Sequence, residues 1–371
     1  MPNQAQINQF FDFAATQLRR LTEMHPDQFP MYTTRGKWDF SGESWTNWCE
    51  GFLGGQLWLL HMHTGSQNWR DKAERYSRLI TPRKEDRTVH DLGFLFWPTW
   101  KRWYDLTGDP ALNAVVVEAG QTLALRFKEN GQYLRSFLAE DSLFIDIMMN
   151  VGIIFYAAQQ ISSANLLRVA TQHCLTTRKY LVRGDGSTAH EGIFDLETGE
   201  FLHQSTQQGW RNDSSWARGL AWALYGFSNV YSMTGDKRFL ATAEACARFY
   251  IENTPEHGVP PNDWDEPNPT VPYESSAAAI AAGGFLNLAG LLKAKEQSTA
   301  RSAARADAYR AYAHRILDTL LTPEFSAHET PGWEGLLKHG AYHQRKGLGV
   351  DESVMWGDYF FMEALYRVAH E

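Results

Sequence analysis

A three-residue turn, Thr-Gly followed by Ser or Asp, recurs along the chain and constrains its fold more than any other feature. It stands at residues 64–66, 107–109 and 234–236. The second copy begins 43 residues after the first, and the third begins 127 residues after the second, close to three times that spacing. Glycine in such a turn ends one helix in a left-handed conformation, and the following Ser or Asp can cap the next helix. A constant period of this length is typical of stacked helical hairpins.

Helical periodicity dominates the whole sequence, and strand-like alternation is scarce. We predict twelve helices, at about 4–22, 44–63, 67–83, 92–106, 110–129, 142–160, 163–182, 214–233, 237–253, 274–294, 300–321 and 352–369. The connection before each even-numbered helix is long, at about 23–43, 84–91, 130–141, 183–213, 254–273 and 322–351. Six hairpins that close in a ring form an all-α (α/α)6 barrel, here a single domain over residues 1–371. Its long loops gather at one end as a funnel, and loops of this length are usually functional.

The sixth predicted helix opens with Asp141 and carries a second acid, Asp146, in its first turns. The apolar residues between Leu143 and Phe155 leave no polar stripe, and a helix that is apolar all round is buried. Burial removes solvent from Asp146, so we expect its pKa to rise and the carboxyl to hold a proton near neutral pH. The alternative is an ordinary cap on nearby N–H groups.

Asp91 follows His90 and opens another apolar helix, which the ring places beside the helix of Asp146. Two nearby carboxylates cannot both ionise cheaply, although helix N-termini favour negative charge. We expect the protonated member to be Asp146, the one set deeper in its helix. Simple capping is the better interpretation for the other polar residues that open inner helices, which are Ser44, Asp141, Asp213, Glu274, Asp351 and Glu352.

Trp216, Arg218 and Trp222 fall within two turns of the eighth predicted helix. Near the mouth of the ring, the planar guanidinium of Arg218 could pair with a substrate carboxylate. The alternative is a buried ion pair with Asp213 or Glu274. The two tryptophans are as compatible with a core as with a platform for sugar rings.

Composition and charge exclude several classes of function. The chain has 14 Trp, 15 Tyr and 21 Phe, an aromatic excess that suits stacking on sugars. A net charge of −8 without a basic stripe argues against a nucleic-acid partner. No metal site, phosphate loop or dinucleotide motif is recognisable, and three widely spaced cysteines indicate a reducing compartment. We find no signal peptide and no apolar run long enough to span a membrane, so we expect a cytoplasmic protein.

Eight short stretches, in order from about residue 40 to the C-terminus, together resemble the unsaturated glucuronyl hydrolases of glycoside hydrolase family 88. Each is weak alone, but the ordered set is specific. The stretches are Trp48-Cys-Glu-Gly-Phe, His90-Asp-Leu-Gly-Phe, Ile145-Asp-Ile-Met-Met-Asn, Arg183-Gly-Asp-Gly-Ser, Gln208-Gly-Trp, Asp213-Ser-Ser-Trp-Ala-Arg-Gly-Leu-Ala-Trp, Ser275-Ser-Ala-Ala-Ala-Ile and Gly347-Leu-Gly-Val-Asp-Glu-Ser-Val-Met-Trp-Gly-Asp-Tyr.

The resemblance implies an (α/α)6 barrel that needs no metal or organic cofactor. It implies a substrate class as well, oligosaccharides that carry a 4,5-unsaturated uronate at the non-reducing end, as polysaccharide lyases leave them. Asp146 is then implied as general acid and base, with Asp91 as its partner carboxylate. The residues implied to bind the substrate are Trp48, His190, Gln208, Trp216, Arg218 and Trp222. Arg211-Asn212 and Glu274 depart from the family pattern, which bears on the glycan beyond the first sugar.

The implied reaction is hydration of a vinyl ether, in which one carboxyl gives a proton to C4 and then takes one from the water that attacks C5. This differs from the two-carboxylate scheme of ordinary glycosidases. Three alternatives stay open: an unsaturated rhamnogalacturonyl hydrolase, a sugar epimerase, and a glycan-binding protein with a dead site. An epimerase would need two histidine bases, and only His90 and His190 are near the funnel. We expect a monomer or a small homo-oligomer.

Overall fold

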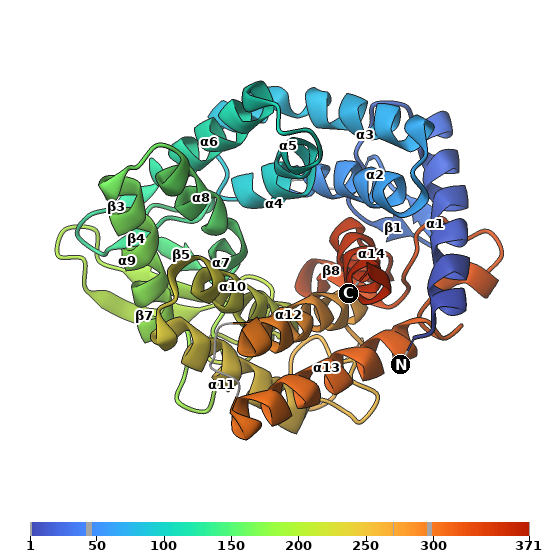
Figure 1. Cartoon of the computed structure of the whole chain (residues 1–371). Helices are drawn as coiled ribbons and strands as arrows, with labels where there is room; N and C mark the ends of the chain where they lie inside the picture. The colour runs from blue at the N-terminus through green and yellow to red at the C-terminus, as the bar shows by residue number, and fades with distance from the viewer. Residues whose placement is uncertain (1, 42–46, 270, 295–298, 371) are drawn as a thin grey trace.

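The computed structural model describes residues 2–41, 47–269, 271–294 and 299–370, and its helices form two concentric rings (Figure 1). The outer ring holds α1 (Gln4–Met24), α3 (Gln67–Leu79), α6 (Pro110–Ala124), α9 (Ala164–Tyr180), α11 (Lys237–Asn253) and α13 (Ala300–Leu320). The inner ring holds α2 (Glu50–Thr64), α4 (Leu92–Phe96) with α5 (Arg102–Thr107), α7 (Ile147–Asn150) with α8 (Gly152–Gln160), α10 (Ala217–Thr234), α12 (Ser275–Ala294) and α14 (Met355–His370).

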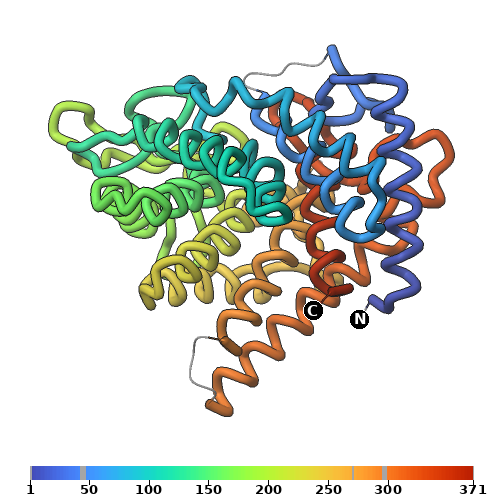
Figure 2. Tube along the Cα trace, turned by 45° about the horizontal axis from the view of Figure 1, so that its top comes forward, coloured from blue at the N-terminus to red at the C-terminus, as the bar shows by residue number. Residues whose placement is uncertain are grey.

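The inner ring is closed. Each inner element contacts the next, and α14 returns to contact α2. The first helix, α1, packs against α14, so the two ends of the chain lie close together (Figure 2). The predicted all-α (α/α)6 barrel is confirmed.

The repeated turn ends the inner helices as predicted, but the predicted side-chain cap forms only at Asp109 and Asp236, since the side chain of Ser66 makes no cap hydrogen bond. Gly65, Gly108 and Gly235 end α2, α5 and α10 in the left-handed region, with φ of 69°, 70° and 69°. Asp109 and Asp236 then accept hydrogen bonds from backbone N–H groups in the first turns of α6 and α11. These turns join each of the three inner elements to the outer helix that follows it.

Three predicted helices differ from the structure at places that matter for the site. The predicted helix 142–160 begins as strand β5 (Ser142–Phe144), and the predicted helix 352–369 follows strand β9 (Leu348–Glu352). Both strands pair with segments far along the chain or across a turn, which helical periodicity does not reveal. The predicted helix 92–106 contains a π turn, Trp97–Lys101, where Pro98 has no N–H to donate.

Other helix starts are also later than predicted. The helix expected at 44–63 begins at Glu50, and that expected at 214–233 begins at Ala217. Ser44 lies outside the described residues. Asp213 and Asp351 therefore do not open inner helices, whereas Glu274 does cap α12, by accepting a hydrogen bond from the N–H of Ala277.

The long connections fold into small antiparallel sheets at one end of the ring. Two-stranded sheets pair β1 (Thr33–Thr34) with β2 (Lys37–Trp38), β3 (Phe127–Lys128) with β4 (Tyr133–Leu134), and β8 (Gly340–His343) with β9. A three-stranded sheet has the order β5, β6 (Glu191–Phe194), β7 (Phe201–Ser205). Short 3-10 helices lie at Thr81–Glu85, Ala327–Glu329 and Gln344–Lys346.

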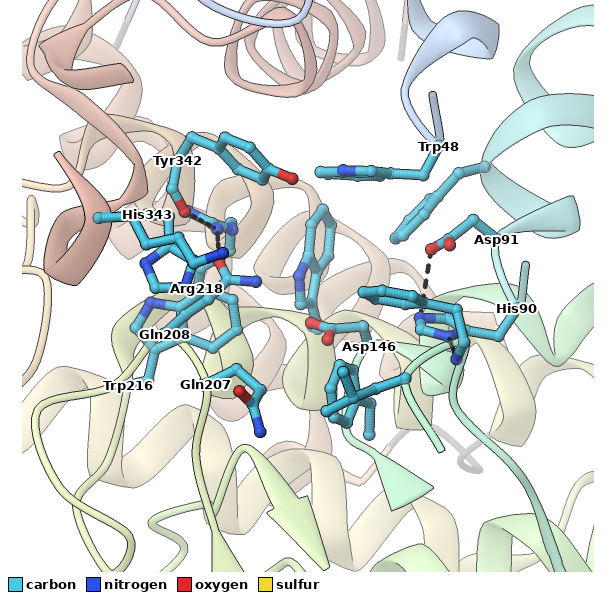
Figure 3. A pocket seen from close by; sticks show the side chains of 16 residues that line it. Trp48, His90, Asp91, Asp146, Gln207, Gln208, Trp216, Arg218, Tyr342 and His343 are labelled. Atoms are coloured by element: carbon cyan, nitrogen blue, oxygen red, sulfur yellow. Dashed lines mark hydrogen bonds and ion pairs between the residues drawn. The ribbon is translucent and has the colours of Figure 1, made fainter. Parts of the chain in front are cut away.

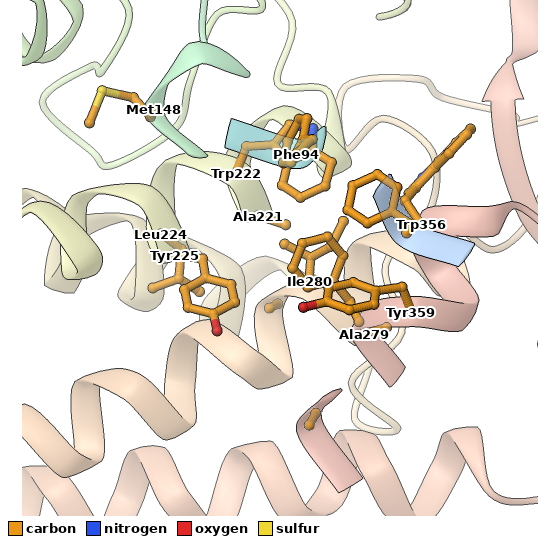
Figure 4. Packing of buried hydrophobic residues seen from close by; sticks show 14 of the residues in the cluster. Phe94, Met148, Ala221, Trp222, Leu224, Tyr225, Ala279, Ile280, Trp356 and Tyr359 are labelled. Atoms are coloured by element: carbon orange, nitrogen blue, oxygen red, sulfur yellow. The ribbon is translucent and has the colours of Figure 1, made fainter. Parts of the chain in front are cut away.

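Apolar side chains from the inner helices fill the middle of the ring. Trp222 packs between Phe94 and Phe360, at ring-centroid distances of 4.9 and 5.4 Å. Figure 4 shows Ile280 below Trp222 and Phe94. The helix α12 corrects one expectation, because by length and composition it could cross a membrane. However, 89% of its most apolar stretch is buried inside the ring, so its apolar character is that of a core helix.

Candidate active site

A cavity of about 180 Å³ opens at the loop end of the ring (Figure 3). It brings together most residues that the sequence indicated, although they come from helix α10 and from the connections before α2, α4, α7 and α10. Among the residues that line it are Trp48, Asp91, Asp146, Gln208, Trp216, Arg218 and Trp222. His190 stands directly behind Asp146, and its side chain is buried.

The three-stranded sheet places Asp146 beside His190. Strand β5 pairs with β6 in the register Phe144 to Glu191, and the N–H of Ile145 donates to the carbonyl of His190 at 2.9 Å. The residue after Ile145 therefore meets the residue before β6. The Nε2 atom of His190 lies 3.4 Å from Oδ2 of Asp146.

Backbone donors fix the tautomer of His190. Its Nδ1 atom accepts hydrogen bonds from the N–H groups of Gln207 and Gln208, at 3.2 and 3.4 Å. Because Nδ1 accepts these bonds, Nε2 carries a hydrogen, and it faces Asp146. Neither this Nε2 nor Oδ1 of Asp146 has a hydrogen-bond partner among the described residues. The contact between His190 and Asp146 therefore contains two buried polar atoms whose hydrogen-bonding capacity is not used by the described residues.

Asp91 has a similar neighbour. His90 accepts the N–H of Phe137 on Nδ1 at 2.9 Å, and its Nε2 lies 3.4 Å from Oδ1 of Asp91. Burial lowers the pKa of His90 well below its usual value, so this ring is neutral. Since each ring has Nδ1 occupied and Nε2 against a carboxyl, neither is free to act as a base. This argues against the epimerase alternative.

The electrostatics of the carboxyl pair correct one expectation. Burial, followed by the charge of Asp146, raises the pKa of Asp91 well above its usual value. The sequence predicts that Asp146 is the protonated member of the pair, because the predicted helix 142–160 places it inside the first turns. Asp146 instead precedes the four-residue helix α7, and Asp91 is the more buried of the two, with 4% against 8% of its surface exposed.

Arg218 forms part of the cavity wall, and its guanidinium is held on all sides. The group stacks between Trp216 and Trp356, at 4.3 and 5.0 Å from the ring centroids. Its nitrogens donate to the carbonyl of Ala341, to the carbonyl of Tyr342 at 2.9 Å and to Oε1 of Gln208. The structure therefore keeps a strong positive charge beside the cavity.

The alternative hypothesis for Arg218 is a buried ion pair with Asp213 or Glu274. The structure agrees with it for Glu274 and not for Asp213. Glu274 lies 4.0 Å away, and its carboxylate accepts hydrogen bonds from Ser276, Ala277 and Ala341. Asp213 is instead exposed and pairs with Arg211. Because Arg218 donates to Oε1 of Gln208, the amide N–H2 of Gln208 can donate to another acceptor.

Aromatic rings make up the rest of the walls. The ring of Trp48 is tilted by 35° against that of Trp356, with centroids 4.7 Å apart, and lies 5.6 Å from Phe94, so it forms a partly exposed wall on one side. Trp216 and Trp222 are 2% and 1% exposed. Both are buried residues that border the cavity, so the interpretation as core residues applies to them, and a role in stacking on sugar rings stays a prediction.

Several lining residues were not recognised in the sequence: Phe137, Leu138, Phe144, Gln207, Tyr342, His343 and Lys346. Tyr342 and His343 end strand β8, inside a segment that reads as a long loop. For Gln207, the only signal in the sequence is its position next to Gln208. Within the described residues, no group of three or more His, Cys, Asp or Glu side chains could hold a metal ion.

Comparison with known proteins gives one consistent result. The family model described as Glycosyl Hydrolase Family 88 matches residues 13–259. An unsaturated glucuronyl hydrolase from Bacillus sp. (strain GL1) is 30% identical over 92% of this chain and 91% of its own length. An unsaturated chondroitin disaccharide hydrolase from Streptococcus agalactiae is also 30% identical, over 87% of this chain and 81% of its own length. A crystal structure of an unsaturated glucuronyl hydrolase specific for heparin superposes with a TM-score of 0.89 at 27% identity, over 99% and 98% of the two chains.

Proposed function

The chain belongs to glycosyl hydrolase family 88, and we propose that Asp146 is the acid and the base of its reaction. The enzyme releases the 4,5-unsaturated uronic acid from the non-reducing end of oligosaccharides that polysaccharide lyases have cut. Its substrate therefore carries both a carboxylate and a vinyl ether. The cavity supplies groups for each of them.

The buried pair of carboxyls supplies the proton. Because burial and mutual repulsion disfavour two negative charges, Asp91 and Asp146 together retain a proton, which belongs to the pair. A uronate that enters adds a third negative charge and strengthens this effect. We assign delivery of the proton to Asp146, since this residue lines the cavity and its Oδ1 atom has no hydrogen-bond partner in the part of the chain that the structure describes.

The reaction then proceeds in two proton transfers. Asp146 gives its proton to C4, and the cation that develops at C5 is stabilised by the ring oxygen. A water molecule attacks C5 and loses a proton to the Asp146 carboxylate. The resulting hemiketal opens to a C5 ketone with the ring oxygen now a hydroxyl on C1. That hemiacetal collapses to an aldehyde and expels the neighbouring sugar with its oxygen.

Substrate-binding roles follow from the same geometry. The amide N–H2 of Gln208 and the charge of Arg218 favour the uronate carboxylate at this wall of the cavity. Trp48 offers its face to a sugar ring. The Nε2–H of His190 is placed to stabilise the carboxylate that Asp146 becomes after it gives up its proton.

A deuterium experiment tests this proposal. Lyase-made disaccharides from chondroitin, hyaluronan, heparin, gellan and pectin are assayed for loss of ultraviolet absorbance, and the best substrate is then cleaved in heavy water. Hydration requires deuterium at C4 and solvent oxygen at C5, whereas hydrolysis at C1 leaves C4 untouched. The product is read early by NMR, because a 5-keto product exchanges C4 hydrogens slowly by itself. Protium alone at C4 in the earliest product would rule the mechanism out.

The Asp146→Asn variant assigns the step to this residue. The amide fills the same space and still hydrogen-bonds, but it cannot act as an acid, so we expect a folded enzyme without turnover. An Asp146→Asn enzyme with a rate near that of the wild type would show that another group gives the proton.

A further inference from the structure

Asn150 joins the two segments that carry the catalytic carboxyls. It is the last residue of α7 and is completely buried. Its Oδ1 atom accepts the N–H of Phe94 at 2.8 Å, and its Nδ2 donates to the carbonyl of Asp146 at 3.2 Å. One amide therefore connects the first turn of α4, which Asp91 opens, to the backbone of Asp146 itself.

The backbones of the same two segments are also in direct contact. Gly93 lies against Asn150, and a Cβ atom on Gly93 would stand 2.5 Å from the Cα and 2.8 Å from the carbonyl oxygen of Asn150. Contacts between α4 and α7 belong to the closed inner ring. Two features therefore set the spacing of Asp91 and Asp146. Gly93 lets the two backbones approach closely, and the amide of Asn150 makes a hydrogen bond to each of the two segments.

The amide of Asn150 makes both of these hydrogen bonds at once, because its acceptor and its donor are separate atoms. The backbone N–H of Phe94 needs an acceptor, and the carbonyl of Asp146 needs a donor. Ionised Asp offers no donor, Leu offers neither, and Ala leaves both backbone groups without a partner. Asn150 does not line the cavity, so it has no contact with substrate that would explain this choice of residue.

We propose that Asn150 is a positioning residue that fixes the relative placement of Asp91 and Asp146 for proton transfer. The proposal rests on the function proposed above, in which the two carboxyls act as a pair. The competing account is a brace that stabilises the ring and leaves the chemistry unaffected. The two accounts differ in what they predict for kcat.

The experiment compares Asn150→Ala and Asn150→Ser with Asn287→Ala. Asn287 is a matched control, because its amide also joins two inner helices, donating from α12 to Ser228 and Asn229 of α10 at 2.8 and 3.0 Å. It is not among the residues that line the cavity. Melting temperature, kcat and KM are measured for each variant with the best disaccharide. All assays are run well below the melting temperatures, with the folded fraction determined by circular dichroism.

A positioning role predicts that kcat falls about 10- to 100-fold for both Asn150 variants, with KM within a few-fold of the wild type, since small misplacements of reacting groups cost this much. Asn287→Ala should lower the melting temperature and keep its kcat. Asn150 variants that melt earlier but keep wild-type kcat per folded enzyme would overturn the proposal. Loss of kcat in Asn287→Ala to the same extent would overturn it as well. A wild type without activity would instead refute the proposed function, so the two failures are distinct.

Discussion

The Nε2 atom of His190 lies 3.4 Å from Oδ2 of Asp146, and this contact follows from the pairing of two short strands far apart in the sequence. The distance is long for a hydrogen bond, and Nε2 has no other hydrogen-bond partner among the described residues. Hydrogen bonds in free active sites are often long and tighten when the reacting state is formed. His190 is therefore placed to respond to the charge on Asp146.

We expect His190→Ala to lower kcat more than it raises KM. A hydrogen bond to a charged group is worth about 1.5–3 kcal/mol, so the fall in kcat should be about 10- to 100-fold. Steady-state kinetics with the best disaccharide measure this change. His203→Ala is the control, since His203 lies exposed on β7 of the same sheet. An increase in KM with unchanged kcat would mean that His190 only binds the substrate.

The pKa of Asp91 should depend on Asp146. Burial is the larger cause of its increase and remains in any variant of Asp146, whereas the repulsion from the second carboxylate is removed in Asp146→Asn. We therefore expect the pKa of Asp91 to fall in this variant and still to exceed the usual value for aspartate. Carboxyl carbon NMR over a pH titration reads it directly. Asp141→Asn is the control and should leave Asp91 as it is. An unchanged pKa in Asp146→Asn would show that the two groups are not coupled.

Local patterns in the sequence were sufficient to predict the ring. The Thr-Gly-Ser/Asp turns and the helical periodicity act within a few residues, and the structure confirms both at Gly65, Gly108 and Gly235. Strand β5 was missed because it is three residues long and pairs with Glu191–Phe194 far along the chain. The resulting error placed Asp146 inside a helix, whereas Asp146 precedes the short helix α7.

The site residues also fall into two groups, those that local motifs indicate and those that only the folded loops bring to the cavity. Asp91, Asp146 and Arg218 stand in recognisable motifs, and they meet at one cavity as expected. Tyr342 and His343 could not be found, because a loop that folds back as a hairpin carries no periodic signal. The sequence likewise left the role of Arg218 open, because only the fold shows that Gln208 and two backbone carbonyls hold it.

Gln208 should control affinity for the uronate. Its Oε1 accepts from Arg218, so its N–H2 is free to donate to a carboxylate in the cavity. Loss of that bond in Gln208→Ala is expected to raise KM about 10- to 100-fold with a small effect on kcat. Gln204→Ala is a matched control, because Gln204 also accepts from an arginine, Arg183, but does not line the cavity. A lower kcat at constant KM for Gln208→Ala would contradict this role.

Stability should fall with acid through a histidine outside the active site. His173 is fully buried, its Nδ1 accepts the N–H of Leu134 at 3.1 Å, and burial lowers its pKa from 6.5 to about 3. Between these two values the unfolded chain binds a proton that the folded protein does not, so the free energy of unfolding decreases as the pH falls through this window. The full loss, reached near pH 3, is about 5 kcal/mol.

His173→Gln keeps an acceptor for Leu134 and removes the titration. Urea unfolding at pH 7 and at about pH 4.5 should therefore show a smaller loss of stability in this variant than in the wild type. His203→Gln, which changes an exposed histidine on β7, should lose as much stability as the wild type. The comparison isolates His173 from His90, whose pKa burial also lowers and which is unchanged in both variants. Equal losses in His173→Gln and the wild type would mean that His173 takes up its proton in the folded protein as readily as in the unfolded chain.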